Sequence, residues 1–359
     1  MFLKNLYLYQ FRAHKEAFFE FNPSMNYIHG ANAQGKTTLL EAIHFLITGR
    51  SFRTSQVTDL IQLGASSFYI EASFVKHGIE QSLKVSCSHK ERKIIYNNTQ
   101  YSSSAPLIGL LQGVVITPDD DSLVKGAPVV RRHFIDLQIA QVDPLYVHYL
   151  VRYNRAMRHR NILLKAKSQT AIESWEYEMA NAAAYLTQQR HHTIKDLEGR
   201  GKAFYDSLSG QKEALSLTYK TTAPLDLGQE SLKQYYLEQF HRHRPRELLL
   251  GYTLAGPHKD DLCISIDQKE ARLFASEGQQ RSCVSALHFA QWEHLQELER
   301  EAPLMLIDDV GVSLDQSRKD KLFSHLKALN QIFITSTDKI PVDWAEKDCT
   351  SIKIEKSSL

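Results

Sequence analysis

An eight-residue loop motif carries the most specific chemistry in the sequence. Gly30-Ala-Asn-Ala-Gln-Gly35-Lys36-Thr37 fits G-x-x-x-x-G-K-[ST], with an apolar run before it and an apolar helical stretch after it. In such a P-loop the backbone N–H groups wrap around phosphates, and the N-terminus of the following helix adds partial positive charge. Lys36 is expected to bind the β- and γ-phosphates of ATP, and the Thr37 hydroxyl to ligate Mg²⁺. The predicted nucleotide contacts are Gly30, Ala31, Asn32, Ala33, Gln34, Gly35, Lys36, Thr37 and Thr38.

A second stretch ends in two carboxylates, as a Walker B segment does. Residues 302–307 form an apolar run, expected to be a buried strand, that leads into Asp308 and Asp309. Asp308 is predicted to hold Mg²⁺ through water, and Asp309 to polarise the attacking water, so Lys36 and Asp309 are the catalytic candidates. Alone, this run could equally be an exposed junction of strand and turn, whereas the P-loop earlier in the chain favours the metal site.

A third motif opens a predicted helix. Ser276, Gly278 and Gln279 form the pattern Ser-x-Gly-Gln about 25 residues before the Walker B run. The plain interpretation is a helix capped by serine. The pattern also resembles the signature motif of ABC-type ATPases, in which one subunit's Ser and Gly contact the γ-phosphate on another subunit's P-loop. That resemblance predicts a nucleotide site completed by a second copy, with slow hydrolysis in the monomer.

The elements around these motifs change character along the chain. Strand-like runs and turns alternate up to about residue 115 and return after residue 246. In the region between these two ends, apolar residues recur with the seven-residue spacing of long packed helices. We predict an α/β fold, an ABC-type P-loop ATPase head built from residues 1–115 plus 247–359, with a mostly helical arm of residues 116–246. Three separate domains are the alternative, but either end alone is too small to cover a parallel sheet.

Composition excludes several classes of protein. The chain has 359 residues with 43 Lys+Arg against 41 Asp+Glu, so any DNA-binding surface must be local. No apolar run approaches the ~20 residues that cross a bilayer, and no export signal is evident, which predicts a cytoplasmic protein without a membrane partner. The four cysteines are widely spaced and are expected to be free thiols, because the spacing fits neither a zinc ribbon nor a disulfide framework.

An acid-free basic stretch in the predicted arm is the candidate DNA contact. No Asp or Glu occurs from Pro144 to Ile172, and positive charge on a helix would neutralise phosphates without reading bases. The alternative is a solvated basic face whose charge is offset by acids elsewhere. The same two interpretations apply to a second basic cluster, at residues 241–246. The DNA-binding candidates are Arg152, Arg155, Arg158 and Arg160.

A third polar cluster, in a predicted turn, has two interpretations. His258, Asp260 and Asp261 could ligate a metal, but their spacing favours structural hydrogen bonds.

Several segments resemble the RecF family of bacterial DNA replication and repair proteins, ABC-type ATPases related to SMC heads. The resemblance spans nearly the whole chain, with two departures. Asp309 stands where most ABC ATPases have Glu, and no His follows the last strand, where Ser336 or Thr337 is a candidate substitute. Of the D-loop only Asp315 carries over, and Gln62 is a candidate Q-loop residue. The segments are residues 5–12, 30–37, 49–53, 117–120, 126–136, 256–261, 276–281, 308–309 and 314–315.

The resemblance implies a function. It suggests an ATP-driven homodimer on gapped DNA or junctions of single- and double-stranded DNA, with weak DNA-stimulated ATPase activity and ATP acting mainly as a dimerisation switch. It also suggests RecO and RecR as partners, help in loading RecA, and support of the SOS response. About 240 residues separate Lys36 from Ser276, too few for the long coiled coil of an SMC protein. The arm and its basic stretch argue against a transporter-associated ATPase.

Overall fold

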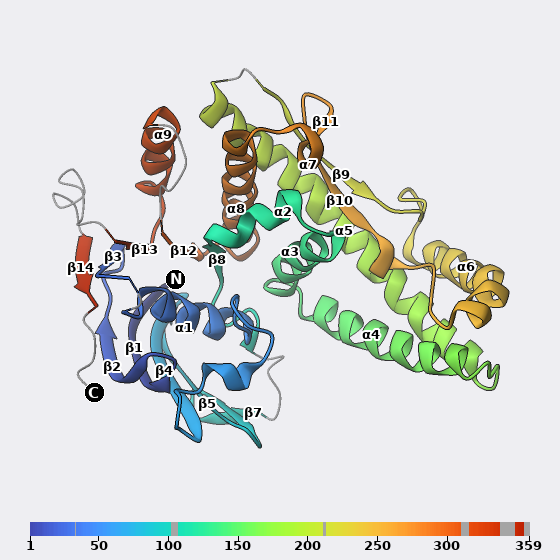
Figure 1. Cartoon of the computed structure of the whole chain (residues 1–359), viewed down its shortest axis with the longest axis horizontal. Helices are drawn as coiled ribbons and strands as arrows, with labels where there is room; N and C mark the ends of the chain where they lie inside the picture. Colours follow the sequence, from blue (N-terminus) through green and yellow to red (C-terminus); the bar gives the residue numbers. More distant parts are fainter. Residues whose placement is uncertain (33, 102–106, 211–212, 310–315, 338–348, 355–359) are drawn as a thin grey trace. The chain divides into compact units, whose positions relative to one another are not determined.

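Two compact units make up the chain in the computed structural model (Figure 1). The structure describes residues 1–32, 34–101, 107–210, 213–309, 316–337 and 349–354. One unit, the head, comprises Met1–Asp121, Phe204–Lys212 and Ser276–Leu359, and the other, the arm, comprises Ser122–Ala203 and Glu213–Ala275.

One sheet of the head is antiparallel, with six strands in the order β2-β1-β4-β5-β6-β7. The register of β1 against β4 shifts between Leu3 and Asn5, so the buried side chains of β1 are Leu3, Leu6, Leu8 and Phe11. All four face the core. The strands are β1 (Phe2–Phe11), β2 (His14–Glu20), β4 (Ser67–Lys76), β5 (Ile79–Ser88), β6 (Arg92–Tyr96) and β7 (Thr99–Tyr101).

The other sheet of the head is parallel and carries the motifs. Its five strands lie in the order β14-β3-β13-β12-β8. Every residue of β12 is buried, as expected for a strand covered on both faces. Strand β12 confirms the buried strand that the sequence predicts before Asp308 and Asp309. The strands are β3 (Met25–His29), β8 (Gly113–Ile116), β12 (Leu304–Ile307), β13 (Ile332–Ser336) and β14 (Cys349–Lys353).

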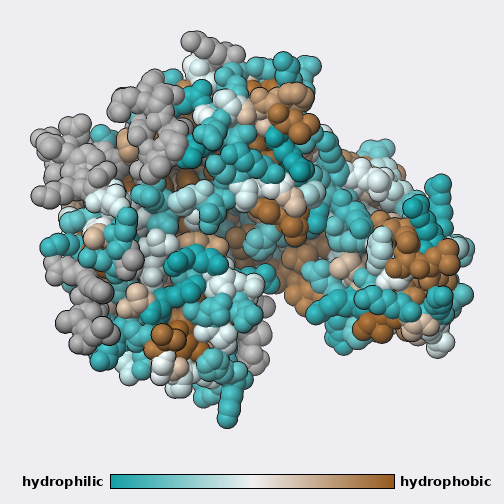
Figure 2. All heavy atoms as spheres, in the orientation of Figure 1, coloured by the Kyte–Doolittle hydropathy of each residue, from teal (hydrophilic) through white to brown (hydrophobic). Residues whose placement is uncertain are grey.

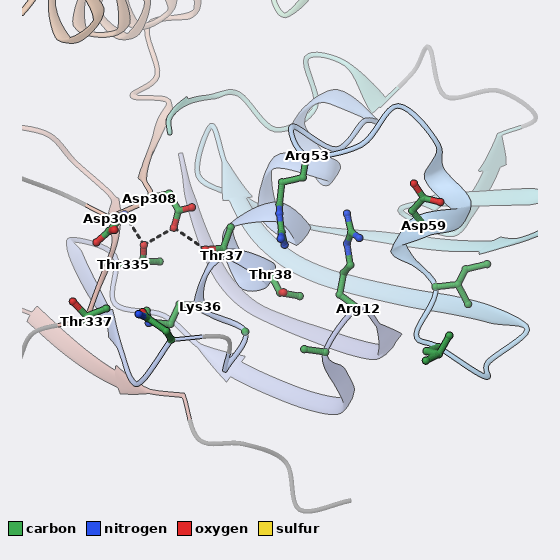
Figure 3. Close-up of a pocket in the computed structure, with 15 residues that line it drawn as sticks. Arg12, Lys36, Thr37, Thr38, Arg53, Asp59, Asp308, Asp309, Thr335 and Thr337 are labelled. Atoms are coloured by element: carbon green, nitrogen blue, oxygen red, sulfur yellow. Dashed lines mark hydrogen bonds between the residues drawn. The ribbon is translucent and has the colours of Figure 1, made fainter. Parts of the chain in front are cut away.

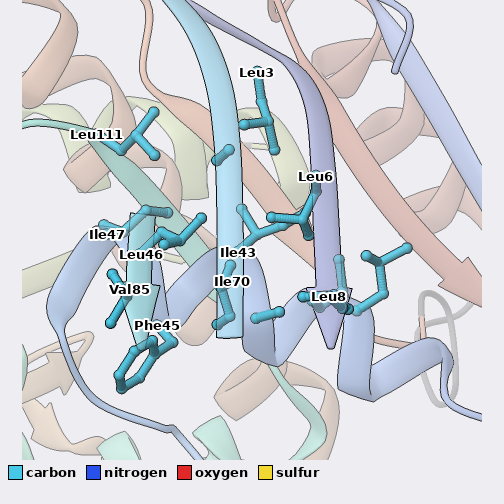
Figure 4. Packing of buried hydrophobic residues seen from close by; sticks show 14 of the residues in the cluster. Leu3, Leu6, Leu8, Ile43, Phe45, Leu46, Ile47, Ile70, Val85 and Leu111 are labelled. Carbon is cyan, nitrogen blue, oxygen red and sulfur yellow. The ribbon is translucent and has the colours of Figure 1, made fainter. Parts of the chain in front are cut away.

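Helix α1 (Lys36–Thr48) is the centre of the head core. Every residue from Thr38 to Thr48 is buried, which requires a helix that is apolar on most of its circumference. Its side chains share one cluster with Leu6 of the antiparallel sheet and Leu306 of the parallel sheet (Figure 4). The position of the first turn of α1, and with it the P-loop, is therefore set by the packing of both sheets.

Further elements complete the head. Helix α8 (Glu277–Glu299) packs near β8, and Phe204 from the end of α5 stacks on Phe289 of α8 with 4.1 Å between ring centroids. The smaller elements are the 3-10 turns η1 (Val57–Leu60) and η3 (Pro118–Asp120) and helix α9 (Gln316–Leu326).

The arm consists of helices around a small sheet in the order β11-β10-β9. The heptad pattern in the sequence corresponds to a single helix, α5, which continues through Gly199 and Gly201. The elements are α2 (Asp121–Lys125), α3 (Pro128–Ala140), α4 (Pro144–Lys165), α5 (Ile172–Ser209), α6 (Gln229–Leu250), α7 (Ala271–Phe274), η4 (Pro257–Lys259), β9 (Leu215–Lys220), β10 (Asp261–Ile266) and β11 (Lys269–Glu270).

The two compact units differ from the predicted division between head and arm, since Phe204–Lys212, assigned to the arm, lie in the head. Residues 247–275 were assigned to the head, whereas they belong to the arm. Strand β10 pairs with β9 from Asp261↔Lys220 to Ile266↔Leu215, and Arg131 of α3 donates to Asp261. These contacts join segments that are far apart in the sequence.

A buried ionic cluster joins three arm helices. The Arg160 side chain of α4 is fully buried, and its Nη2 donates to Glu176 Oε1 of α5 at 2.8 Å and to Glu247 Oε2 of α6 at 2.6 Å. Its Nη1 donates to Thr253 Oγ1 at 2.9 Å. The prediction that Arg160 contacts DNA was therefore wrong, because this guanidinium lies on the inward face of α4.

Replacement of Arg160 tests this cluster. We expect Arg160→Ala to lower the free energy of unfolding by about 3–5 kcal/mol, because buried Glu247 loses its counter-charge and buried Glu176 keeps only its ion pair with Arg244. The matched control is Arg155→Ala on the exposed face of the same helix, expected to change stability by less than about 0.5 kcal/mol. Urea unfolding followed by circular dichroism measures both. Equal stability of the two variants would contradict the assigned role.

Candidate functional site

The loop between β3 and α1 has the backbone of a phosphate cradle. Gly30 and Gly35 have φ of 156° and 109°. A Cβ at Gly30 would lie 2.5 Å from the Ile354 carbonyl oxygen, and one at Gly35 would lie 3.0 Å from the His14 ring. Both positions thus require glycine for conformation and for space.

Lys36 lies over this loop. Its Nζ donates to the carbonyl oxygens of Gly30 at 2.7 Å and Ala31 at 3.0 Å. Gln34 Oε1 accepts from the Ala31 N–H at 2.9 Å, which ties the two ends of the loop together. The ammonium is consequently held beside the backbone that would surround a phosphate. Ala33, also predicted as a contact, lies outside the described residues.

The Asp308 carboxylate joins three elements at one end of the parallel sheet (Figure 3). Its Oδ1 accepts from Thr37 Oγ1 of α1 at 3.1 Å and from Thr335 Oγ1 of β13 at 2.6 Å. Thr335 Oγ1 in turn accepts from the Asp309 N–H at 2.9 Å. Thr37 and Asp308, the two predicted metal ligands, thus lie within hydrogen-bond distance of each other, and Thr335 connects the Asp308 carboxylate and the Asp309 backbone to the neighbouring strand.

Strand order explains this convergence. In the parallel sheet β13 lies between β3, which leads into the P-loop, and β12, which leads into Asp308. Ile307 pairs with Ile334, and Ile334 pairs with Tyr27, so the three strands end at a similar level. Ligands of open α/β sheets bind at this carboxyl edge.

Burial affects the charge of Asp308. Burial raises the pKa of its carboxyl, the neighbouring Asp309 raises it further, and the hydroxyls of Thr335 and Thr37 partly offset both effects. The ionised form is therefore disfavoured compared with a carboxyl in water. A divalent cation would stabilise that form, and hydroxyl and carboxylate oxygens are ligands that Mg²⁺ prefers.

A pocket of about 760 Å³ is lined by five of the nine predicted P-loop contacts and by both Walker B aspartates. It also contains residues that the motif analysis did not select. The predicted residues in its wall are Asn32, Gly35, Lys36, Thr37, Thr38, Asp308 and Asp309, and the additional polar ones are Arg12, Arg53, Asp59, Thr335 and Thr337. Of the two suggested substitutes for the missing histidine, Thr337 lines the pocket and Ser336 does not. Gln62 does not line it, although Ile61 and Leu63 do.

Two arginines of the pocket share a buried carboxylate. Arg12 donates to Glu41 through Nε at 3.0 Å and Nη2 at 2.7 Å, and Arg53 Nη1 lies 3.6 Å from the same carboxylate. Glu41 is fully buried on α1, and Ser51 also donates to it. Two guanidiniums against one carboxylate leave excess positive charge at the pocket wall, which suits a phosphorylated ligand. The sequence offered a signal for Arg12 and Arg53 as site residues, since both occur in segments that resemble the RecF family.

The signature residues lie apart from this pocket. Ser276 Oγ accepts from the Gln279 N–H at 3.3 Å, and Gln279 Oε1 accepts from the Ser276 N–H at 2.8 Å, a capping box at the start of α8. Neither residue lines the pocket, nor does Gly278. Within one chain the plain capped helix is thus the observed role. Asp315 of the D-loop lies outside the described residues.

The cluster at residues 258–261 makes structural hydrogen bonds, as predicted. Tyr153 Oη lies 2.6 Å from His258 Nδ1, and Tyr219 Oη donates to Asp260 at 2.5 Å. Asp261 is paired with Arg131. Burial lowers the pKa of His258 to about 4, which keeps its imidazole neutral. Across the part of the chain that the structure describes, no three potential metal ligands come together.

The basic stretch of α4 divides between two faces. Arg155 and Arg158 are exposed, and the Arg158 Nε donates to the Asn154 carbonyl oxygen at 3.3 Å. Arg152 is partly exposed and forms an ion pair with Glu178.

Among the described residues, no helix is long and apolar enough to span a bilayer.

Comparison with known proteins gives consistent matches over the full chain. The family model for the RecF/RecN/SMC N-terminal domain matches residues 2–357. The DNA replication and repair protein RecF of Protochlamydia amoebophila is 53% identical over 349 residues, which cover 97% of each chain.

Solved structures agree with this result. A structure of the recombination mediator protein RecF with ATP in the RecFOR pathway has a TM-score of 0.90 at 29% identity, covering 98% of this chain and 95% of that one. An Smc head bound to the C-terminal winged-helix domain of ScpA has a TM-score of 0.56 at 17% identity, covering 94% and 90%, and shows the fold alone. The predicted ABC-type ATPase head is thereby confirmed.

Removal of the Thr335 hydroxyl tests the Asp308 cluster. We expect Thr335→Val to raise the Mg²⁺ concentration for half-maximal nucleotide binding about tenfold, because Asp308 loses its shortest hydrogen bond and its orientation. A fluorescent ATP analogue titrated at several Mg²⁺ concentrations measures this. Thr48→Val is the control, since Thr48 is a buried threonine at the other end of α1. An equal shift in both variants would argue for general destabilisation.

Proposed function

We propose, since this chain belongs to the RecF family of DNA replication and repair proteins, that ATP closes two copies of it into a dimer that holds DNA. The observation that carries the proposal is the convergence of Lys36, Thr37 and Asp308 in one pocket that contains none of the chain's own signature residues. Such a pocket binds a nucleotide by itself and is completed by a second subunit.

ATP and Mg²⁺ fit the residues present. The Lys36 ammonium would exchange the carbonyls of Gly30 and Ala31 for the β- and γ-phosphates, and the backbone from Gly30 to Thr38 would surround the phosphates. Thr37 and Asp308 would hold Mg²⁺, which supplies charge neutralisation on the phosphate oxygens. A related RecF has been solved with ATP, which supports the same ligand here.

Hydrolysis would be slow. Asp309 is the candidate for orienting the attacking water, and its backbone is held at a φ of 56° next to Thr335. Its side chain is one methylene shorter than the Glu found in most ABC ATPases. The expected activity is therefore a weak, DNA-stimulated ATPase, in which ATP acts mainly by stabilising the closed dimer.

The signature residues would act on the partner's nucleotide. Ser276 is exposed at the start of α8, and the N-terminus of this helix adds partial positive charge. The Ser276 hydroxyl, the Gly278 N–H and the Gln279 side chain are proposed to contact a γ-phosphate on the second copy. Two such sites form in a symmetric dimer.

DNA would be bound by the arm through its exposed cations. Arg155 and Arg158 carry this role, with a smaller part for the ion-paired Arg152. The family resemblance further supports gapped or junction DNA as substrate, RecR and RecO as partners, help in loading RecA, and support of the SOS response.

Dimerisation with ATP is the central test. Light scattering of the full chain with ATP and Mg²⁺ is expected to show a dimer, which Lys36→Met abolishes because the phosphates lose their cation. Ser276→Asp keeps a good helix cap but repels the γ-phosphate, so it should also remain monomeric. Lys4→Met, an exposed lysine of β1, is the control. Monomers that bind DNA equally well with and without ATP would refute the switch.

A double charge reversal tests the DNA surface. Arg155→Glu combined with Arg158→Glu is expected to weaken DNA binding and to lower the slope of log affinity against log salt by about 2, since each lost phosphate contact contributes about 0.9. Fluorescence anisotropy at several salt concentrations measures both. The control reverses Lys90 and Lys93 in the head to Glu. An unchanged salt slope would place the DNA elsewhere.

A further inference from the structure

Exposed apolar side chains stand beside both halves of the proposed ATP site. Leu63, in the wall of the nucleotide pocket, has a relative exposure of 102%. Leu273 and Phe274 are each 68% exposed and directly precede Ala275 and Ser276, where the signature begins. Single exposed apolar residues are common, but these three border the two surfaces that a second copy would bring together.

Leu63 projects from a turn that is anchored to the head. The Gln62 N–H donates to the Gln10 carbonyl at 2.8 Å, and the Ala65 N–H donates to the Gln62 carbonyl at 2.9 Å. Ile61 forms a β-bridge with Phe11. The backbone is thus tied to β1, while the Leu63 side chain is fully exposed to solvent. An apolar side chain held in solvent at a fixed position is suited to a contact between molecules.

Leu273 and Phe274 lie on an ordered element as well. Helix α7 buries Ala271, and the Ala275 N–H donates to the Ala271 carbonyl at 3.1 Å. Since one residue of this short helix anchors it, the next three residues, Arg272, Leu273 and Phe274, all remain exposed. Apolar surface is visible over α7 in Figure 2. Aromatic and arginine side chains held in this way are typical of interface anchors.

The charges of the two surfaces are complementary. The pocket rim carries Asp59 ahead of Ile61 and Leu63, and Figure 3 places Asp59 on the side of the pocket away from Asp309. Helix α7 carries Arg272 ahead of Leu273 and Phe274. Asp59, Ile61 and Leu63 on this part of the rim thus match a basic and apolar helix, while Arg12 and Arg53 of the same wall are held against Glu41. This match favours a second copy of this chain as the occupant, whereas DNA would find a single phosphate contact, at Arg272.

We propose that Leu273 and Phe274 of one subunit pack on the partner's Ile61 and Leu63, with Arg272 facing the partner's Asp59. The inference rests on the proposed ATP-closed dimer and deepens it. The contact brings the signature of one copy to the rim of the other copy's pocket and shields the phosphates from water. Because the dimer is symmetric, the contact occurs twice.

Truncation measures the apolar part of the contact. In sedimentation of the full chain with ATP and Mg²⁺, Phe274→Ala is expected to weaken dimerisation about tenfold, the effect of losing an interface anchor. Leu249→Ala is the matched control, an apolar residue of α6 with 81% exposure. The affinity of the Phe274→Ala monomer for a fluorescent ATP analogue is expected to stay unchanged, since Phe274 does not line the pocket.

Charge reversal identifies the partner surface. Arg272→Asp alone places two acids face to face, and Asp59→Arg alone places two bases face to face, so both variants are expected to dimerise at least tenfold more weakly. A mixture of the two chains should recover dimerisation, because both contacts of the mixed dimer then join opposite charges. A defect of Asp59→Arg in nucleotide binding would not be rescued by mixing.

The outcomes separate this inference from the function on which it rests. If Ser276→Asp is monomeric while Arg272→Asp and Phe274→Ala dimerise like the wild type, the rim contact is wrong and the ATP-closed dimer stands. If the wild type stays monomeric with ATP, the dimer itself is wrong. Loss of binding to another protein by Phe274→Ala, with dimerisation intact, would assign the apolar pair to that protein and overturn the proposal.

Discussion

The Asp308 carboxylate and the two hydroxyls that donate to it connect the nucleotide site to the rest of the head. Thr37 lies 271 residues away in sequence and Thr335 lies 27 away, yet both reach the same oxygen. Neutral donors hold this partly buried carboxylate in place without cancelling its charge, so a cation entering the pocket finds an oriented ligand. The P-loop helix, the Walker B strand and the strand between them must keep their relative positions for this arrangement to persist.

Those positions follow from the packing of α1. The helix is buried along almost its whole length between the two sheets, and its first residues are Lys36 and Thr37. A shift of the core would move the Lys36 ammonium and the Thr37 hydroxyl together. The loop glycine Gly30 cannot be replaced without a shift of the backbone, since a Cβ there would meet the carbonyl oxygen of Ile354. The site is thus constrained on one side by apolar packing and on the other by close backbone contact.

The sequence predicted the parts of the site that are local and missed those that depend on strand order. The P-loop and the Asp308 run are contiguous patterns, so they could be identified directly. Thr335 could not, because its role arises only when β13 lies between β3 and β12. Arg160 was misplaced because a basic stretch indicates charge but no direction. Its spacing from the buried residues Tyr153 and Ala156, one helical face, was the available signal that it points inward.

The burial of arginines also changes how the near-neutral charge of the chain relates to DNA. Arg160, Arg190 and Arg131 are each paired with carboxylates inside the arm, so they contribute to the count of bases without attracting phosphates. The exposed cations that remain on α4 offer few phosphate contacts, and with few contacts one arm binds weakly at physiological salt. In the proposed dimer two arms would engage DNA together, and the second would then bind at the high effective concentration set by the first. A nucleotide that only joins two subunits would therefore be sufficient to convert weak DNA binding into strong binding, without any change in the DNA-contacting residues themselves.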